Sequence, residues 1–222
     1  MNTFEEIFAI AADRKDGLDA IISSWGSPKS ITNLTDIPDD RWLSCMTRCV
    51  FQAGFNWKVV EHMWPGFEDA FNGFDIGACM MLSDDDFGRL VSDKRIVRNG
   101  QKIKTVQQNA AFLNTLIAQH GRAGAFFGAW PSGDYVRLLA LMKKQGSRLG
   151  GNTGQYFLRS MGVDSFILSR DVTARLIAEG VVDKAPTSQK EMAAVQDAFN
   201  EWCAQSGRSL TEVSRILALS IG

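Results

Sequence analysis

Apolar residues recur at helical spacing along most of the chain, and strand-like alternation is scarce. Val195, Phe199 and Trp202 form one such helical face. Ser188 and Glu191 have the spacing of a capping box, in which two side chains satisfy amides at the start of a helix. The pattern indicates an all-α protein. It predicts helices at residues 4–12, 16–23, 39–53, 57–63, 67–72, 84–91, 101–119, 133–144, 152–160, 170–179, 188–205 and 210–219.

The likeliest irregular connector is the stretch 26–38. Gly26, Pro28, Asn33 and Pro38 all fall within it, and glycine and proline interrupt helices. We therefore expect residues 1–38 to form a helical accessory arm and residues 39–222 to form the main domain.

Composition excludes several classes of protein. The chain has 222 residues, of which 45% are hydrophobic and 22% charged, so it is long and apolar enough to bury a core. Its four cysteines form no Cys-x-x-Cys pair and it has two histidines, so we expect no metal site and no cofactor. No apolar run reaches membrane-spanning length. We expect a reduced, cytoplasmic monomer with no membrane partner.

A glycine-rich turn interrupts the helical pattern between Lys143 and Gly154. Glycines allow the backbone to turn tightly, and the helix that follows offers free amides and a positive dipole end that can bind a phosphate. From the glycines alone, an ordinary αα-hairpin is the better interpretation. Further along, Asp171 lies at the expected start of a helix. Taken alone, it is better explained as a helix cap than as a carboxylate facing a cleft.

Three motifs together resemble a known family. They are Gln52–Trp57, Ile96–Ile103 followed by Asn109-Ala110, and the segment from Lys143 to Gly162. In their order and spacing, the residues from Cys49 to Val172 resemble the 3-methyladenine DNA glycosylase I family of the helix-hairpin-helix glycosylase superfamily. The resemblance implies an all-helical fold with two helical lobes around a base-binding cleft.

The same resemblance implies base excision from damaged double-stranded DNA. An alkylated purine such as 3-methyladenine is flipped out of the duplex, because its glycosidic bond is shielded in the stack. The enzyme then binds the base, stabilises an oxocarbenium-like sugar and admits water. The formal net charge of −1 means that DNA must be bound by a local basic patch.

The resemblance implies a base pocket formed by Trp57, Cys49, Gln52 and Asn56. The ring of Trp57 would stack on a cationic base, although a core tryptophan is an equal alternative. Phe55 would be the wedge that fills the gap left by the flipped base, and simple packing is its alternative.

The resemblance also assigns residues that contact the DNA backbone. Arg98 and Lys102 would bind phosphate, unless they only solvate a helix face. The hairpin would grip the backbone mainly through its amides. Its residues are Leu149, Gly150, Gly151, Asn152, Thr153 and Gly154.

Several positions depart from the family pattern. Cys49 replaces a pocket glutamate, which puts the preference for 3-methyladenine in question. Ile167 and Asp171 stand where the family has zinc-binding histidine and cysteine. Other branches place a catalytic aspartate at this point, so we expect Asp171 to be the catalytic carboxylate. Gln155 stands where lyase branches have lysine, and glutamine cannot form a Schiff base, so we expect a monofunctional enzyme.

Two alternatives stay open. Instead of a glycosylase for alkylated purines, the protein would be a DNA-binding or lesion-sensing protein that has lost catalysis, or a glycosylase for a different base, such as a deaminated or oxidised one. Cys49 favours the first alternative, and Asp171 opposes it.

Overall fold

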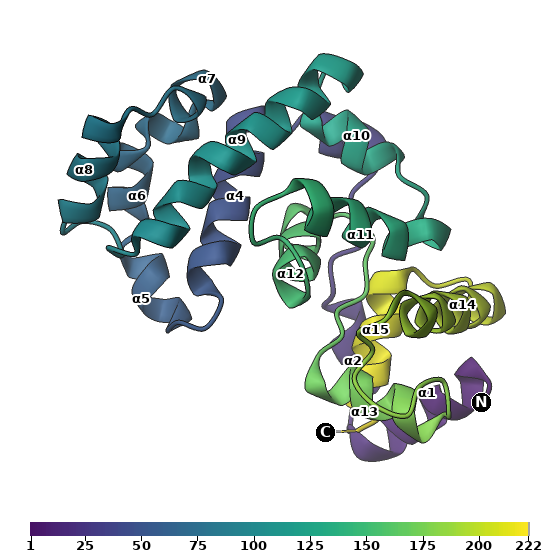
Figure 1. Cartoon of the computed structure of the whole chain (residues 1–222). Coiled ribbons are helices and arrows are strands. Elements are labelled where there is room, and N and C mark those ends of the chain that lie inside the picture. The colour runs from purple at the N-terminus through teal and green to yellow at the C-terminus, as the bar shows by residue number, and fades with distance from the viewer. Residues whose placement is uncertain (222) are drawn as a thin grey trace. The chain divides into compact units, whose positions relative to one another are not determined.

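The computed structural model describes residues 1–221, and helices are the only regular elements in that part of the chain (Figure 1). The predicted all-α class is therefore confirmed. The α-helices are α1 (Phe4–Arg14), α2 (Leu18–Ser23), α3 (Ile31–Thr35), α4 (Asp39–Gln52), α5 (Trp57–His62), α6 (Trp64–Ala70), α7 (Ile76–Met80), α8 (Asp84–Ser92), α9 (Gly100–His120), α10 (Ala123–Ala129), α11 (Tyr135–Gln145), α12 (Asn152–Met161), α13 (Arg170–Ala178), α14 (Gln189–Ser206) and α15 (Leu210–Leu219). Short 3-10 helices lie at Asn72–Phe74 and Ser132–Asp134.

Contacts divide the chain into two compact units. Unit 1 contains Met1–Lys29, Trp130–Leu138 and the described chain from Gly162 on. Unit 2 contains Ser30–Ala129 and Leu139–Met161. The role of residues 1–38 as an accessory arm stays a prediction.

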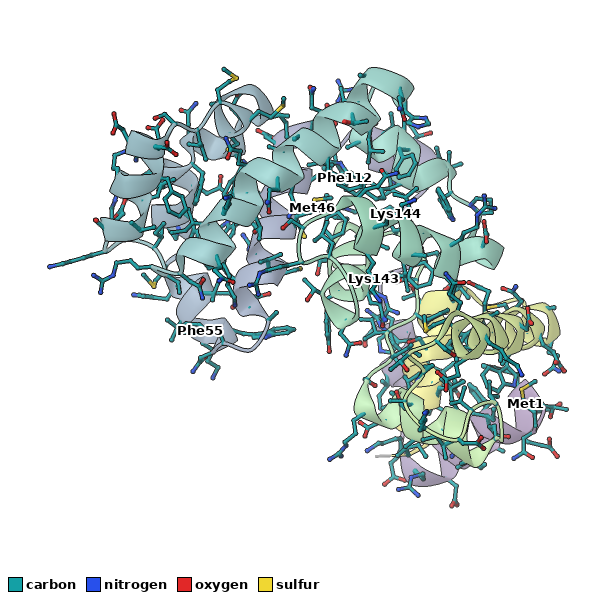
Figure 2. The ribbon with its side chains drawn as sticks, viewed as in Figure 1. Met1, Met46, Phe55, Phe112, Lys143 and Lys144 are labelled. Carbon is teal, nitrogen blue, oxygen red and sulfur yellow. The ribbon has the colours of Figure 1, made fainter. Side chains whose placement is uncertain are left out.

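The core of unit 2 forms around α4. The ring of Trp42 stacks on Phe127, with centroids 4.9 Å apart, and Phe157 meets it edge-on at 5.9 Å. Met46 and Phe112, labelled in Figure 2, are also buried. The long helix α9 packs against α4, α7, α8 and α10, and α12 packs against α4 (Figure 1). Burial of these large apolar side chains is the main stabilising contribution in this unit.

Three short helices of unit 2 were not predicted. The expected irregular connector 26–38 contains α3, whose first turn is capped by Ser30, with the Asn33 amide 3.2 Å from the Ser30 hydroxyl. Asp75 caps α7 in the same way through the Ala78 amide, at 2.7 Å. Both helices have five residues and α10 has seven. Helices this short do not show a full hydrophobic period, and packing rather than propensity holds them.

Unit 1 is a cluster of α1, α13, α14 and α15. Helix α15 packs against the other three. The rings of Phe166 and Phe199 stack at 4.3 Å, and Trp202 meets Phe199 edge-on at 5.8 Å. The predicted capping box of Ser188 and Glu191 is confirmed at the start of α14.

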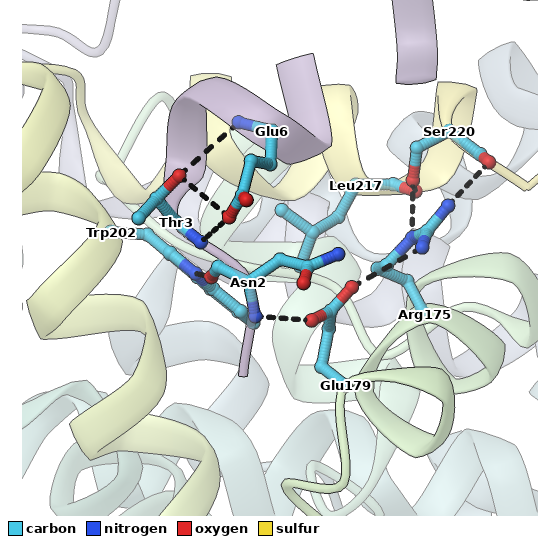
Figure 3. Close-up of polar contacts among 8 residues, drawn as sticks. All are labelled: Asn2, Thr3, Glu6, Arg175, Glu179, Trp202, Leu217 and Ser220. Atoms are coloured by element: carbon cyan, nitrogen blue, oxygen red, sulfur yellow. Dashed lines mark hydrogen bonds and ion pairs between the residues drawn. The ribbon is translucent and has the colours of Figure 1, made fainter. Parts of the chain in front are cut away.

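A buried polar network joins the beginning of the chain to the end of unit 1 (Figure 3). Arg175 donates to the Glu179 carboxylate at 3.2 Å and to the hydroxyl and carbonyl oxygens of Ser220 at 2.7 Å each. Glu179 also accepts the backbone amide of Asn2 at 2.6 Å, and Trp202 donates to the Asn2 carbonyl at 3.1 Å. Breaking such a buried pair leaves an uncompensated charge, so the network fixes the position of α1 within unit 1.

No helix in the described part of the chain has the length and apolar character needed to cross a membrane.

Candidate functional site

The turn between α4 and α5 exposes the large side chain of Phe55. The Ala53 amide donates to the Cys49 carbonyl at 3.1 Å and ends α4, and the Phe55 amide donates to the Gln52 carbonyl at 3.0 Å. Phe55 is 45% exposed and is labelled at the margin of unit 2 in Figure 2. Phe55 is therefore an exposed side chain in a tight turn, and its role as a wedge stays a prediction.

A cavity of about 360 Å³ opens beside this turn, between α4, α5 and α12. We call it the α4–α5 cavity. Its lining residues are Arg41, Ser44, Cys45, Arg48, Cys49, Gln52, Trp57, Glu61, Ser160 and Met161. Three of the four predicted base-pocket residues, Cys49, Gln52 and Trp57, therefore share one cavity.

Asn56, the fourth predicted pocket residue, is not among the lining residues. Its side-chain oxygen accepts the Lys58 amide at 3.0 Å and caps α5. The cap fixes the first turn of α5, which carries Trp57, so Asn56 acts on the cavity through its neighbour.

Trp57 is an exposed side chain and not a core tryptophan. Its side chain is 48% exposed, and its ring meets the ring of Tyr156 edge-on at 5.3 Å. This contact holds one edge of the indole while a large part of the ring remains open. An indole held in this way is suited to stacking on a planar ligand.

Cys49 is buried at the wall of the cavity. A hydrogen bond with Cys45 lowers the pKa of the Cys49 thiol, burial opposes this effect, and the Arg48 charge and a hydrogen bond with Ser160 lower the pKa further. The thiol therefore has an increased tendency to carry negative charge at the position where the family has glutamate.

A polar cluster centred on Glu68 joins α4 to α6. Glu68 accepts two hydrogen bonds of 2.9 Å from Arg41, one of 2.8 Å from Ser44 and one of 2.9 Å from Trp64. Burial alone raises the pKa of Glu68, but these donors outweigh burial and leave the pKa below its ordinary value. Hydrogen bonding to Glu68 also raises the pKa of Arg41.

Most of the polar lining residues were not anticipated from the sequence, although their spacing along α4 follows one helical face. The lining residues of α4 lie at relative positions 0, 3, 4, 7, 8 and 11, which is one helical face. They are Arg41, Ser44, Cys45, Arg48, Cys49 and Gln52. A polar stripe on a helix whose other faces are apolar and buried indicates a lined cavity rather than a solvated surface.

The predicted hairpin between α11 and α12 is confirmed as a tight turn. Arg148 and Gly151 both have positive φ, 57° and 58°. The side chain of Asn109 fixes this turn, because its oxygen accepts the Ser147 amide at 2.7 Å and its nitrogen donates to the Ser147 carbonyl at 3.1 Å. The Asn109-Ala110 motif thus gains a physical role that its sequence did not reveal.

The hairpin residues divide into anchors and exposed positions. Leu149 is 1% exposed, so its side chain anchors the turn and only its backbone is available to a ligand. Gly154 is also buried, and a Cβ there would overlap the Leu149 carbonyl. Gly151 and Asn152 are exposed, whereas Gly150 and Thr153 are half-buried. The exposed positions of the hairpin therefore lie at the start of α12.

The two predicted phosphate ligands differ in their contacts. Arg98 is exposed. The ammonium of Lys102 donates to the carbonyls of Phe51 at 3.1 Å and Ala53 at 2.8 Å. Burial and the nearby charge of Arg148 lower the pKa of Lys102. Lys102 thus holds the end of α4, a role that neither earlier alternative included.

Asp171 lies in the first turn of α13 in unit 1, but it is not the cap. Ser169 is the capping residue, with the Val172 amide 3.2 Å from its hydroxyl, so the cap interpretation of Asp171 is wrong. Asp171 pairs with Arg170 at 3.2 Å, and the side chains are 35% and 94% exposed respectively. Such exposed pairs contribute little to stability.

Within residues 1–221, no group of three or more His, Cys, Asp or Glu side chains is arranged to hold a metal ion.

Comparison with known proteins gives the family. The methyladenine glycosylase family model matches residues 24–137, just over half of the chain. No curated protein matches the chain.

Solved structures with a similar fold include a variant of 3-methyladenine DNA glycosylase I in complex with 3-methyladenine. It is 18% identical, with a TM-score of 0.53, and the match covers 69% of this chain and 90% of that chain. A mutant of the 3-methyladenine DNA glycosylase I from Staphylococcus aureus is 16% identical, with a TM-score of 0.52 and coverage of 81% and 98%.

The Methanocaldococcus jannaschii 8-oxoguanine glycosylase/lyase in complex with DNA is 13% identical, with a TM-score of 0.51 and coverage of 96% and 95%. At these identities the likeness shows a shared fold, and the family model supplies the membership. The chain belongs to the methyladenine glycosylase family and is a DNA N-glycosylase with the all-helical fold of the helix-hairpin-helix glycosylases.

Proposed function

We propose that this glycosylase hydrolyses the N-glycosidic bond of an alkylated purine flipped out of double-stranded DNA. One observation carries the proposal: an exposed phenylalanine and an exposed, edge-held tryptophan flank a tight turn that borders a polar cavity. The volume of about 360 Å³ lies in the range of small-molecule sites, roughly 300–1,000 Å³. Phe55 enters the gap in the duplex, and Trp57 stacks on the base.

The hairpin and Arg98 hold the DNA backbone. The amides at the start of α12 face a phosphate, which positions the enzyme without reading sequence. Exposed Lys143 and Lys144, labelled in Figure 2, and Arg148 add positive charge around the turn. This local charge explains how a chain with a net charge of −1 binds DNA.

Asp171 is the catalytic carboxylate of the proposal. It stabilises the positive charge that develops on the sugar and orients the water that attacks it. It lies in the first turn of α13, paired with Arg170. Gln155 occupies the position of a Schiff-base lysine, so the product is an abasic site in an intact strand.

Released-base analysis tests the proposal. Wild-type protein should release free base from methylated duplex DNA, without strand breaks on a denaturing gel. Asp171→Asn should abolish release and retain binding to a duplex with an abasic-site analogue. The matched control is Asp134→Asn, since Asp134 is also an exposed unit 1 aspartate paired with a neighbouring arginine. Full activity of Asp171→Asn would remove the catalytic role.

The hairpin has its own test. Gly151→Val should weaken binding to every DNA sequence alike, because the turn contacts only phosphate. Gly207 is the matched control, because its φ of 68° is similar and it also has open space around its Cβ position. Gly207→Val imposes the same backbone strain within unit 1. Equal DNA affinity of the two variants would contradict the hairpin assignment.

A second candidate function is a lesion sensor without catalysis, favoured by Cys49 at the family glutamate position. It predicts tight binding to damaged duplexes and no base release from alkylated, deaminated or oxidised DNA.

A further inference from the structure

Two charged side chains of the α4–α5 cavity, Arg48 and Glu61, have no ion-pair partner in the described residues. Arg48 lines the cavity, and its Nε is buried without a hydrogen-bond partner. No carboxylate lies within ion-pair distance of Arg48 anywhere in residues 1–221. Glu61 lines the same cavity and accepts only a long hydrogen bond of 3.5 Å, from Gln52. A guanidinium without a carboxylate partner at a cavity wall favours a ligand that offers acceptors to its terminal nitrogens.

Arg41, the other arginine of the cavity, is not available for this purpose. Its guanidinium donates to both oxygens of Glu68, to Asp40 and to the Gly73 carbonyl. Four of these contacts are 3.3 Å or shorter, so nearly all of its donors are occupied. Arg48 is therefore the guanidinium of this cavity that a ligand can engage.

Arg48 is also held in place. Its guanidinium carbon lies 4.4 Å from the centre of the Trp64 ring. Trp64 is itself fixed by its hydrogen bond to Glu68 and by stacking on Phe67 and Phe74. An arginine that stacks on a fixed aromatic ring presents its planar donors in a defined direction.

These donors match one edge of a purine and oppose another. Guanine presents two acceptors side by side, O6 and N7, and arginine pairs with both; adenine presents an amino donor in place of O6. The one acidic lining residue, Glu61, is on α5, whereas Arg48 is on α4. Glu61 is thus placed on a different wall, where it can accept the ring and amino hydrogens of guanine.

We propose that Arg48 and Glu61 select a guanine-type base, alkylated at N3 so that O6 and N7 remain free, over the corresponding adenine. This rests on the proposed function and narrows its alkylated purine to one that carries a carbonyl oxygen at position 6. Arg48 is the specificity-determining donor, and Glu61 is the complementary acceptor.

Methylated duplex DNA tests the proposal, because it contains 3-methylguanine and 3-methyladenine in one substrate. The two bases carry the methyl group at the same ring position and differ in the edge that Arg48 faces. Wild type should release 3-methylguanine with the higher rate constant. Arg48→Met keeps the apolar contact with Trp64 and removes the donors. It should reduce the ratio of the two rate constants about tenfold to a hundredfold, the effect of one hydrogen bond from a charged donor.

The control is Arg89→Met, which removes an exposed arginine of α8 outside the cavity and should leave the ratio unchanged. Binding of Arg48→Met to a duplex with an abasic-site analogue should equal that of wild type, which excludes loss of the fold. A preference for 3-methyladenine, or a ratio unchanged in Arg48→Met, overturns this inference while the proposed function stands.

If no base is released at all, a binding measurement still tests the base preference apart from the catalytic proposal. Titration calorimetry with free 3-methylguanine and free 3-methyladenine examines the cavity without catalysis. Tighter binding of 3-methylguanine that depends on Arg48 supports the inference even when the catalytic proposal fails. Equal affinity, or tighter binding of 3-methyladenine, overturns it.

Discussion

Replacing Lys102 with methionine removes one ammonium from the end of α4. That ammonium donates to the carbonyls of Phe51 and Ala53, directly before the turn that carries Phe55. Methionine retains the aliphatic stem, so the packing of the side chain is largely preserved. The change therefore isolates the two hydrogen bonds and the charge that faces the negative end of the α4 dipole.

The two hydrogen bonds of Lys102 determine how much the free energy of unfolding should fall. A hydrogen bond from a charged donor contributes roughly 1.5–3 kcal/mol when fully buried. Lys102 is only half-buried, and the released carbonyls regain water, so we expect a total loss of about 2 kcal/mol in the free energy of unfolding. For a chain of this size, that loss lowers Tm by about 4–8 °C.

Thermal denaturation and DNA binding at several salt concentrations distinguish two roles of Lys102: capping α4 and binding a DNA phosphate. If Lys102 caps α4, Tm falls and the dependence of log K on log salt is unchanged. If it binds a phosphate, the salt slope falls by about one unit. Lys104→Met is the matched control, because Lys104 is an exposed residue of the same helix, two positions away.

We expect the capping result: Lys102→Met is less stable than Lys104→Met and has the salt slope of wild type. An unchanged Tm together with a reduced salt slope would show instead that Lys102 binds a DNA phosphate.

Three further predictions concern the hairpin, the cysteines and the acid response. Gly154→Ala should lower the unfolding free energy by about 2 kcal/mol in denaturant titrations, because its Cβ would overlap a backbone carbonyl of the turn. Cys49 should be alkylated at neutral pH before Cys79 and Cys203, as followed by mass spectrometry, since burial raises the pKa of the Cys79 and Cys203 thiols to about 12. Glu68 has a folded-state pKa below its ordinary value of 4.5, so its contribution to stability is present above that pH and is lost as pH falls through the lowered pKa. Glu68→Gln should therefore show a weaker loss of stability below pH 4.5 in acid titrations than wild type does.

The long helices could be predicted from the sequence because each contains several turns of a regular hydrophobic pattern. Helices α4, α9 and α14 have this property, and their predicted positions agree with the structure to within two residues. By contrast, α3, α7 and α10 are short and are defined by caps and by packing against other helices. Such contacts are not visible in a local pattern.

The candidate site was predictable only in part. The family resemblance predicted that Trp57 and Cys49 share a pocket, and both line one cavity in the structure. Arg48 and Glu61 were not anticipated, because their proximity depends on α5 folding back beside α4. The clamp of Asn109 on the hairpin joins residues 38 positions apart, a distance at which sequence spacing gives no information.

Released-base analysis on methylated duplex DNA shows whether this protein removes a base from damaged DNA. Wild-type protein should give free methylated purine and an intact abasic strand, and Asp171→Asn should release no base. Binding to alkylated, deaminated and oxidised duplexes without release of any base would contradict it.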